Sequence, residues 1–430
     1  MNHKLVGILT FLTIIFQHFQ ITSLAGFPVS LGSVTGIMLV LFVSRPQTID
    51  GFVWSWCALI CLSGAAAMVS SADADAMHYL RTLALFMLAV AIILLGNSGS
   101  RSQFIASDEF ARAVFAALVT VVTLSVTQVI FGALKSQAFF NVFGSHQYLY
   151  EYNPHLEYVV IPRAQGFYLE PSYDAFIICT LSVVLFCLKK RMRWAVLLVT
   201  VGLLSCQSAS GLLLMVVVLL FAILRSRPMI AAVSTLILCI VGWTSGPYLA
   251  SRLNSIDETS TSANFRIVAP LRVLGDILAQ KPLGEPLGAI ELVMGRYGLL
   301  NGASAGTSLD NGFYVLVFYF GWIGMLFLGA MVTFGALTTV RQMFAGTGFH
   351  WVAPLWLLGS FMFSGGIMLP EFAIMTWLVI AAFGHSRDRR DGEVGELGKY
   401  GIRHPPIRRD RDIQRPRRTQ ENPKLSQTFI

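Results

Sequence analysis

The sequence alternates between long apolar segments and polar joints, and the joints are of two kinds that follow one another in turn. One kind is short and rich in Lys and Arg, as at residues 189–193. The other kind includes two long polar excursions, at about residues 135–166 and 250–309. Basic residues accumulate in the cytoplasmic loops of membrane proteins. The alternation therefore predicts that both excursions lie together on the opposite, non-cytoplasmic side.

The composition favours a polytopic membrane protein. Of the 430 residues, 55% are hydrophobic and 13% are charged, whereas a soluble domain has about 25% charged residues. The net charge of +8 lies in the short joints and in the segment after His385. That distribution points to membrane orientation and anionic lipid headgroups, so we expect no nucleic-acid partner. The six cysteines lie in apolar runs without a CxxC spacing, so no disulfide framework, metal site or cofactor is expected.

The apolar segments predict about twelve transmembrane helices, since a span needs about 20 apolar residues. They cover residues 5–22, 27–43, 52–69, 80–95, 110–134, 168–188, 194–206, 211–224, 229–249, 311–333, 352–364 and 367–383. The predicted fold is an all-α polytopic membrane domain over residues 1–385. Residues 386–430 are basic and polar without apolar periodicity, which predicts a disordered tail.

The basic joints are consistent with one topology. If His3 and Lys4 are cytoplasmic, every second joint carries Lys or Arg, at Arg45, Arg101, 189–193, Arg225 with Arg227, and Arg341. The chain then ends on the cytoplasmic side with the basic residues 387–390. We therefore expect both termini to be cytoplasmic.

Charged residues gather where the first excursion meets the next span. Arg163, Glu170 and Asp174 crowd this point, and charges near the membrane interior commonly mark a functional site. Pro171 suits the first turn of a helix, which places Glu170 at the positive end of the helix dipole. The alternative is a simple helix cap with an Arg partner. In the excursion itself, His146 lies near several tyrosines and is a candidate general base; such tyrosines stack on sugars or sit at membrane interfaces.

The second excursion supplies two arginines and an acid. Arg266 precedes, and Arg272 lies within, a predicted amphipathic helix with apolar residues at 271, 274, 277 and 278. Guanidinium groups bind phosphate oxygens in a bidentate manner, and the alternative role is snorkelling at the membrane interface. Asp310 precedes the next span, where a lone acid would usually be a cap.

These segments together resemble the bacterial Wzy-type polysaccharide polymerases and O-antigen ligases. The similar blocks are residues 163–172, 208–211, 265–284, 310–314 and 320–324. In overall size and style the chain is similar to the polymerases of xanthan-type exopolysaccharides. In the ligases a His precedes the Asn of the fourth block, whereas this sequence has Asp310 before Asn311.

The resemblance implies a metal-independent, cofactor-free glycosyltransferase of the membrane-embedded GT-C class in the bacterial inner membrane. Its substrate would be a glycan linked to undecaprenyl pyrophosphate, and its loops at about 135–167 and 250–310 would be periplasmic. Arg266, together with Arg163 and Arg272, would hold the pyrophosphate. The base would be Glu170 or Asp310, and the further substrate-binding candidates are Tyr173, Asn311 and His146.

The expected partners are the lipid bilayer, the lipid-linked glycan, a flippase and chain-length-regulating proteins. Three alternatives stay open: an O-antigen ligase-like transferase, a lipid-linked glycan transporter or flippase, and a non-enzymatic scaffold. A transporter predicts internal repeats and charges deep within the spans. The sequence shows no clear repeat and few such charges.

Overall fold

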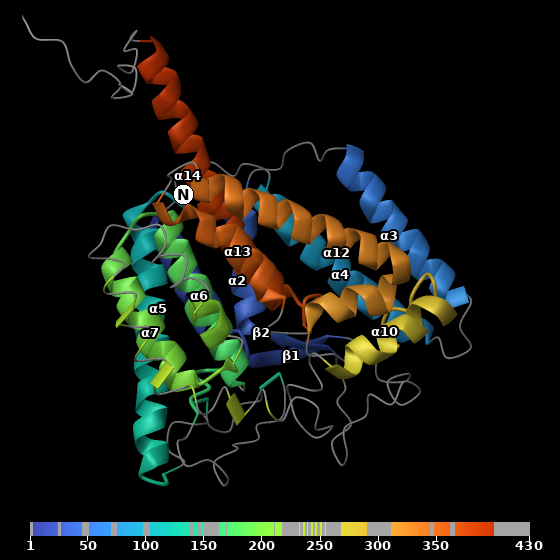
Figure 1. The fold of residues 1–430 in the computed structure, drawn as a ribbon, viewed down its shortest axis with the longest axis horizontal. Helices are drawn as coiled ribbons and strands as arrows, with labels where there is room; N and C mark the ends of the chain where they lie inside the picture. Colours follow the sequence, from blue (N-terminus) through green and yellow to red (C-terminus); the bar gives the residue numbers. More distant parts are fainter. Residues whose placement is uncertain are drawn as a thin grey trace, which may run out of the picture. The chain divides into compact units, whose positions relative to one another are not determined.

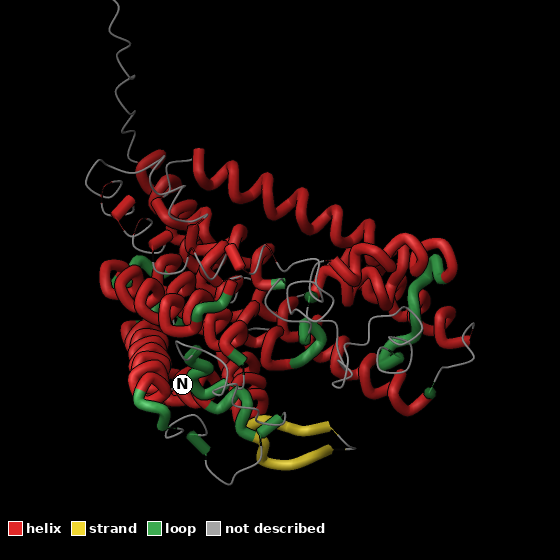
Figure 2. The backbone as a smooth tube through the Cα atoms, turned by 60° about the horizontal axis from the view of Figure 1, so that its bottom comes forward, coloured by secondary structure: helices red, strands yellow, loops and turns green. Residues whose placement is uncertain are grey.

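The computed structural model describes most of the apolar segments. It covers residues 3–24, 27–44, 51–69, 75–97, 104–136, 142–143, 148–149, 163–168, 170–209, 211–216, 268–289, 311–344, 348–361 and 366–399, with isolated residues between 232 and 254. The described part is mainly helical, with one small sheet (Figure 2). The chain divides after Arg387 into two compact units.

The helices follow most of the predicted spans. Their bounds are α1 His3–Ile15, α2 Leu31–Val43, α3 Gly51–Val69, α4 Ala76–Asn97, α5 Asp108–Ala133, α6 Pro171–Cys187, α7 Met192–Cys206, α10 Ala269–Gln280, α12 Gly312–Phe344, the 3₁₀ helix η3 Gly348–Trp351, α13 Val352–Ser360 and α14 Pro370–Lys399. By length and composition, three described helices could cross a membrane: Ala76–Leu95, Asp108–Ala133 and Gly312–Phe344. The predicted spans 211–224 and 229–249 lie largely outside the described residues, and the predicted tail boundary at 386 falls within α14.

A two-stranded sheet corrects the all-α prediction. Strands β1 (Gln20–Leu24) and β2 (Phe27–Ser30) pair antiparallel, so the predicted spans 5–22 and 27–43 are shorter as helices. The β-branched residues Ile21, Thr22 and Val29 favour extended backbone. Pro28 disfavours helix because it has no backbone N–H to donate.

Helix α6 forms the centre of the core. Every residue from Ser172 to Cys187 is buried, and α6 packs against α5, α7 and α13 (Figure 1). The rings of Phe176 and Phe372 stack with centroids 5.3 Å apart, which joins α6 to α14. A helix buried on all sides inside a bundle needs apolar residues around its whole circumference, and the sequence of α6 supplies them.

The helices define two ends. At the first, the basic end, Lys190 Nζ lies 2.8 Å from Asp108 Oδ1, and the rings of His3 and Phe104 lie 4.8 Å apart. The predicted basic joints around Arg101 and at 189–193 therefore meet at this end, beside the start of α1. At the second, the sheet end, the β1–β2 pair follows α1 and precedes α2 (Figure 1).

Helix α12 is interrupted at Gly321, where the sequence predicted a continuous span. Gly321 has φ 52° and ψ −129°. The segment 281–289 forms hydrogen bonds with α12 on both sides of Gly321. Trp322 N donates to Pro282 O at 3.0 Å, and Glu285 N donates to Phe318 O at 2.8 Å. These bonds satisfy backbone groups that the break leaves unpaired within the helix. Because α10 directly precedes this segment, these contacts tie the end of α10 to the break in α12.

Candidate active site

A short strap at residues 163–168 lies at the sheet end between α5 and α7. Ala164 N donates to Ser205 O at 3.0 Å. The side chain of Gln128 on α5 accepts from Gln165 N at 3.0 Å and Gly166 N at 2.8 Å, and its Nε2 donates to Gly166 O at 2.8 Å. Both helices therefore hold the strap by its backbone. This fixes the position of Arg163, its first residue.

Asp174 lies beneath the strap. Its Oδ2 accepts from Ser125 Oγ at 2.7 Å and from Cys206 Sγ at 3.0 Å, and the side chain is fully buried. Gly166, at φ +59°, packs on the carboxyl group: a Cβ there would lie 2.4 Å from Asp174 Oδ1. Asp174 thus lies inside the bundle, deeper than the exposed Glu170 at the start of the same helix. A buried carboxyl in an apolar helix is costly and commonly marks a functional region.

Three predicted site residues lie on the strap and the first turn of α6. Arg163 is half-buried, and its Nε donates to Cys206 O at 3.4 Å. Glu170 is exposed, and its Oε2 accepts from Ser172 Oγ at 3.0 Å. It is the N-cap of α6 without a side-chain capping bond. The structure therefore brings Arg163 and Glu170 to the same end and leaves the Glu170 carboxylate accessible.

Tyr173 is the third of these residues, and it is mostly buried. Its hydroxyl donates to Gln17 Oε1 at 2.8 Å, and its ring lies 4.5 Å from that of His18. His18 lies in the turn after α1, outside the helices, and burial lowers its pKa to about 3. The imidazole is therefore neutral at physiological pH. Tyr173 is positioned by its neighbours, and its ring belongs to the wall of the sheet end.

Asn311 caps α12. It is buried, and its Oδ1 accepts from Phe313 N at 3.0 Å, as an N-cap residue does. The next residue, Gly312, donates its N–H to Phe361 O at 2.8 Å. The first turn of α12 is therefore fixed against the end of α13, and the capping contact accounts for the Asn at this position.

A chain of phenylalanine rings joins three helix N-termini. The ring of Phe313 stacks on Phe361 at 5.5 Å, Phe361 lies 5.6 Å from Phe372, and Phe372 stacks on Phe176 at 5.3 Å. The chain runs from the first turn of α12 through the first turn of α14 to α6. The beginnings of α6, α12 and α14 are therefore close together.

The beginning of α2 belongs to the same group. Glu371 in the first turn of α14 accepts hydrogen bonds through Oε1 from the hydroxyls of Ser30, at 2.7 Å, and Ser33. Ser30 is also the N-cap of α2, accepting from Ser33 N at 2.9 Å. Four helices thus begin at the sheet end. Helix N-termini carry partial positive charge, which favours a nearby anion.

The remaining predicted residues are not tested by the structure. Arg266, Asp310 and His146 lie outside the described residues, as does the side chain of Arg272 in α10. Among the described side chains, no group of three or more His, Cys, Asp and Glu could hold a metal ion.

Sequence reasoning missed several polar residues of this end. Gln128, Ser125, Ser30, Ser33 and Glu371 lie within or beside apolar runs, and each bonds to a residue distant in sequence. The sequence signal that could have pointed to them is a polar residue inside an otherwise apolar helix, because a buried polar group needs a hydrogen-bonding partner.

Comparison with known proteins places these features in a family. The sequence matches the family described as WcaD colanic acid polymerase over residues 5–384. A relative from Escherichia coli (strain K12), named "Putative colanic acid polymerase", is 26% identical over 227 residues, which are 50% of this chain and 55% of the relative. The match thus spans about half the length of that relative. The family agrees with the resemblance to Wzy-type polymerases, and since its match extends over nearly all of the helical region, the chain belongs to the WcaD colanic acid polymerase family.

Proposed function

We propose that this protein polymerises oligosaccharide repeat units carried on undecaprenyl pyrophosphate, at the periplasmic face of the bacterial inner membrane, during exopolysaccharide or O-antigen synthesis. Family membership and the name of the relative support this activity. Both favour a polymerase over the ligase-like transferase and the flippase. The transfer uses the free energy of the lipid-linked donor and needs no cofactor or metal.

The convergence of four helix N-termini at the sheet end carries the proposal. Breaking a sugar–pyrophosphate bond leaves negative charge on the departing diphosphate, and fixed positive groups stabilise that charge in the transition state. The helix dipoles of α2, α6, α12 and α14 contribute to such a field, and the first turns of α6 and α14 also hold the buried acids Asp174 and Glu371. Arg163 adds a guanidinium at the strap, and Arg266 and Arg272 complete the pyrophosphate site.

The acceptor hydroxyl must lose its proton as it attacks the donor sugar. A general base therefore has to stand beside it. Glu170 is exposed at the start of α6, so its carboxylate can reach a substrate in the aqueous phase, and Asp310 is the second candidate. Tyr173, Asn311 and His146 are the further candidates for substrate binding. The hydroxyl oxygen bonds to the sugar carbon while the bond to the pyrophosphate oxygen breaks.

The proposed topology is a GT-C-like bundle of about twelve spans with cytoplasmic termini. The basic end faces the cytoplasm, and the sheet end faces the periplasm together with the loops at about 135–167 and 250–310. The last span ends near residue 385, and the part of the chain that follows is cytoplasmic. A flippase delivers the substrate, and chain-length-regulating proteins act on the product.

Gene replacement in the native bacterium tests this function. Deletion is expected to leave single repeat units and to abolish high-mass polymer, while restored wild-type protein returns it. Arg163→Ala, at wild-type membrane abundance, is expected to leave single units. Normal polymer in the deletion strain would refute a polymerase. Loss of a glycan conjugate with intact polymer would identify a ligase.

A further inference from the structure

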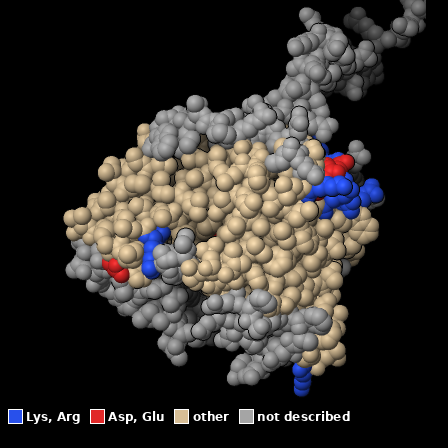
Figure 3. Space-filling view, turned by 180° about the vertical axis from the view of Figure 1, so that it is seen from behind, with Lys and Arg blue, Asp and Glu red and all other residues tan. Residues whose placement is uncertain are grey.

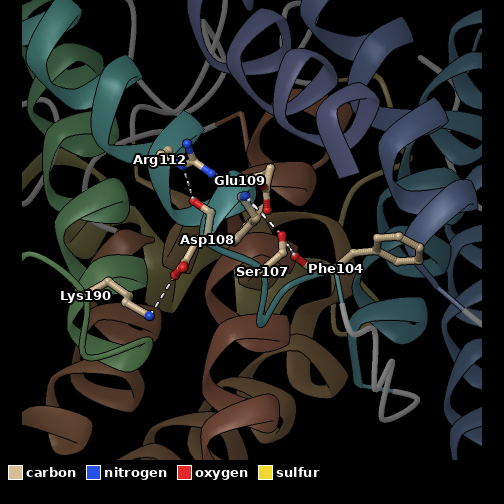
Figure 4. Close-up of polar contacts among 7 residues, drawn as sticks. Phe104, Ser107, Asp108, Glu109, Arg112 and Lys190 are labelled. Carbon is tan, nitrogen blue, oxygen red and sulfur yellow. Dashed lines mark hydrogen bonds and ion pairs between the residues drawn. The ribbon is translucent and has the colours of Figure 1, made fainter. Parts of the chain in front are cut away.

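A second polar region lies at the basic end, away from the strap. It is a shallow cavity of about 260 Å³ where α5 begins and where α6 turns into α7. Figure 4 shows that Lys190 reaches across to Asp108. Arg112 folds back along α5 towards Glu109. The lining residues are Asp108, Ala111, Arg112, Lys190 and Arg191.

Positive charge predominates around this cavity. Lys190 Nζ is 2.8 Å from Asp108 Oδ1, and Arg112 Nη2 is 2.8 Å from Glu109 Oε1. Arg191 makes no ion pair with the described residues; its guanidinium lies 4.5 Å from the ring centroid of Phe115. The exposed Lys189 and Arg193 flank it. In Figure 3, the charged side chains of the described surface form a few small groups on a mostly uncharged face (Figure 3).

The turn that carries these cations is strained. Lys189 and Arg191 both have left-handed backbone conformations, with φ of 54° and 52°. This conformation is unfavourable for residues other than glycine. The turn directs Lys190 to Asp108 and Arg191 over Phe115. Both side chains are thereby held above α5, which preorganises the positive wall of the cavity.

An apolar stripe begins directly below the turn. Trp194, Leu197 and Val201 on α7 are 60%, 52% and 36% exposed. Spacings of three and four residues place them on one face of the helix. Tryptophan is enriched at the level of lipid headgroups in membrane proteins. A free phosphate ion would use only the cations, whereas a phospholipid would use the cations and the stripe together.

We propose that this cavity binds the phosphate headgroup of an anionic phospholipid, with the acyl chains along Trp194, Leu197 and Val201. Basic pockets at the membrane surface recognise anionic headgroups in this way. The site is separate from the proposed polymerase site and does not depend on that activity. Its role is to anchor the α6–α7 turn, and so α6, in the bilayer.

Thermal unfolding of the full-length protein in nanodiscs tests the proposal. Wild-type protein is compared in phosphatidylcholine alone and with phosphatidylglycerol added, and the quantity read is the lipid-dependent rise in Tm. The double variant Lys190→Gln with Arg191→Gln is expected to lose most of that rise. The control Arg341→Gln, a single exposed cation at the end of α12, is expected to keep it. Reading the difference between lipids removes the separate effect of leaving Asp108 without Lys190.

A further measurement distinguishes a lipid headgroup from free phosphate as the ligand of the cavity. Inorganic phosphate added to phosphatidylcholine nanodiscs is expected to leave Tm unchanged, and a rise equal to that from phosphatidylglycerol would refute the lipid assignment. An undiminished lipid-dependent rise in the double variant, or an equal loss in Arg341→Gln, would also overturn the proposal. If the double variant does not fold, Arg191→Gln alone is measured, and an unchanged rise contradicts the site.

Discussion

The side chain of Gln128, within α5, binds the backbone of Gly166 through both of its polar atoms: Oε1 accepts from Gly166 N and Nε2 donates to Gly166 O, each at 2.8 Å. Gln128 therefore acts on the strap as a neighbouring β-strand would. A residue inside a helix thereby sets the path of the segment that carries Arg163. The proposed function needs that segment to be held in place.

Replacing Gln128 should loosen the strap. Gln128→Leu removes three hydrogen bonds and leaves buried backbone groups of Gln165 and Gly166 without these partners. Each unsatisfied buried group costs about 1–3 kcal/mol, so we expect a clear loss of stability and of polymer. Unfolding in mixed micelles measures the loss of stability, and the length of the polymer measures the loss of function. Thr127→Val is the control, because Thr127 is only half-buried and bonds only within its helix among the contacts described; equal effects in both variants would contradict a specific role.

Adding a methyl group at Gly166 should separate the strap from Asp174. The new Cβ would lie 2.4 Å from Asp174 Oδ1, at a φ that disfavours other residues. Gly166→Ala is expected to lower stability by about 1–3 kcal/mol and to reduce polymer. Gly329→Ala in α12 meets open space and should be neutral or slightly stabilising. If the Gly166→Ala variant had the stability and polymer yield of wild type, the strap could move away from Asp174 without consequence.

The break in α12 should depend on Gly321. A Cβ there would lie 2.2 Å from Pro282 O, so Gly321→Ala should displace the segment that follows α10. We expect increased protease cleavage between residues 281 and 289 in vesicles, compared with wild type and Gly329→Ala. An unchanged cleavage pattern would show that the contact with Pro282 is dispensable.

His18 should make stability depend on pH. Burial lowers its pKa to about 3 in the folded protein, whereas an unfolded His has a pKa of about 6.5. Folding therefore favours the neutral form, and the stabilisation is complete above pH 6.5 and declines as pH falls towards 3. At pH 5.5 the loss is about 1.4 kcal/mol. Unfolding at pH 7.5 and 5.5 should show this loss in wild type and a smaller one in His18→Gln; equal losses would exclude His18 as the cause.

Apolar segments could be found from the sequence because partition into a membrane is a local property of each segment. The starts of α4, α5, α6 and α7 accordingly lie within a few residues of the prediction. The break at Gly321 could not be found, because it is stabilised by Pro282 and Glu285 from a distant segment. The β1–β2 pair likewise replaces helix at the ends of two apolar runs.

The site could be predicted only in part. Arg163, Glu170 and Tyr173 are close in sequence to the start of α6, and the structure places them at one end. The supports of that end come from remote segments: Glu371 bonds to Ser30 and Ser33, and Gln128 bonds to the strap. A single sequence does not show which polar residues meet across the bundle. For the same reason the buried partners of Asp174, Ser125 and Cys206, could not be named from the sequence.

Elongation by purified protein tests the central claim most directly. The protein in vesicles receives undecaprenyl-pyrophosphate-linked repeat units, without nucleotide and with a metal chelator, and product lengths are followed over time. We predict a ladder of growing polymer for wild type and a rate lower by about 100-fold for Arg163→Ala, the size of effect seen when one transition-state donor is removed. If Arg163→Ala elongated polymer at the wild-type rate, the strap would not be part of the active site. A wild-type protein that leaves the units unjoined would contradict the polymerase itself.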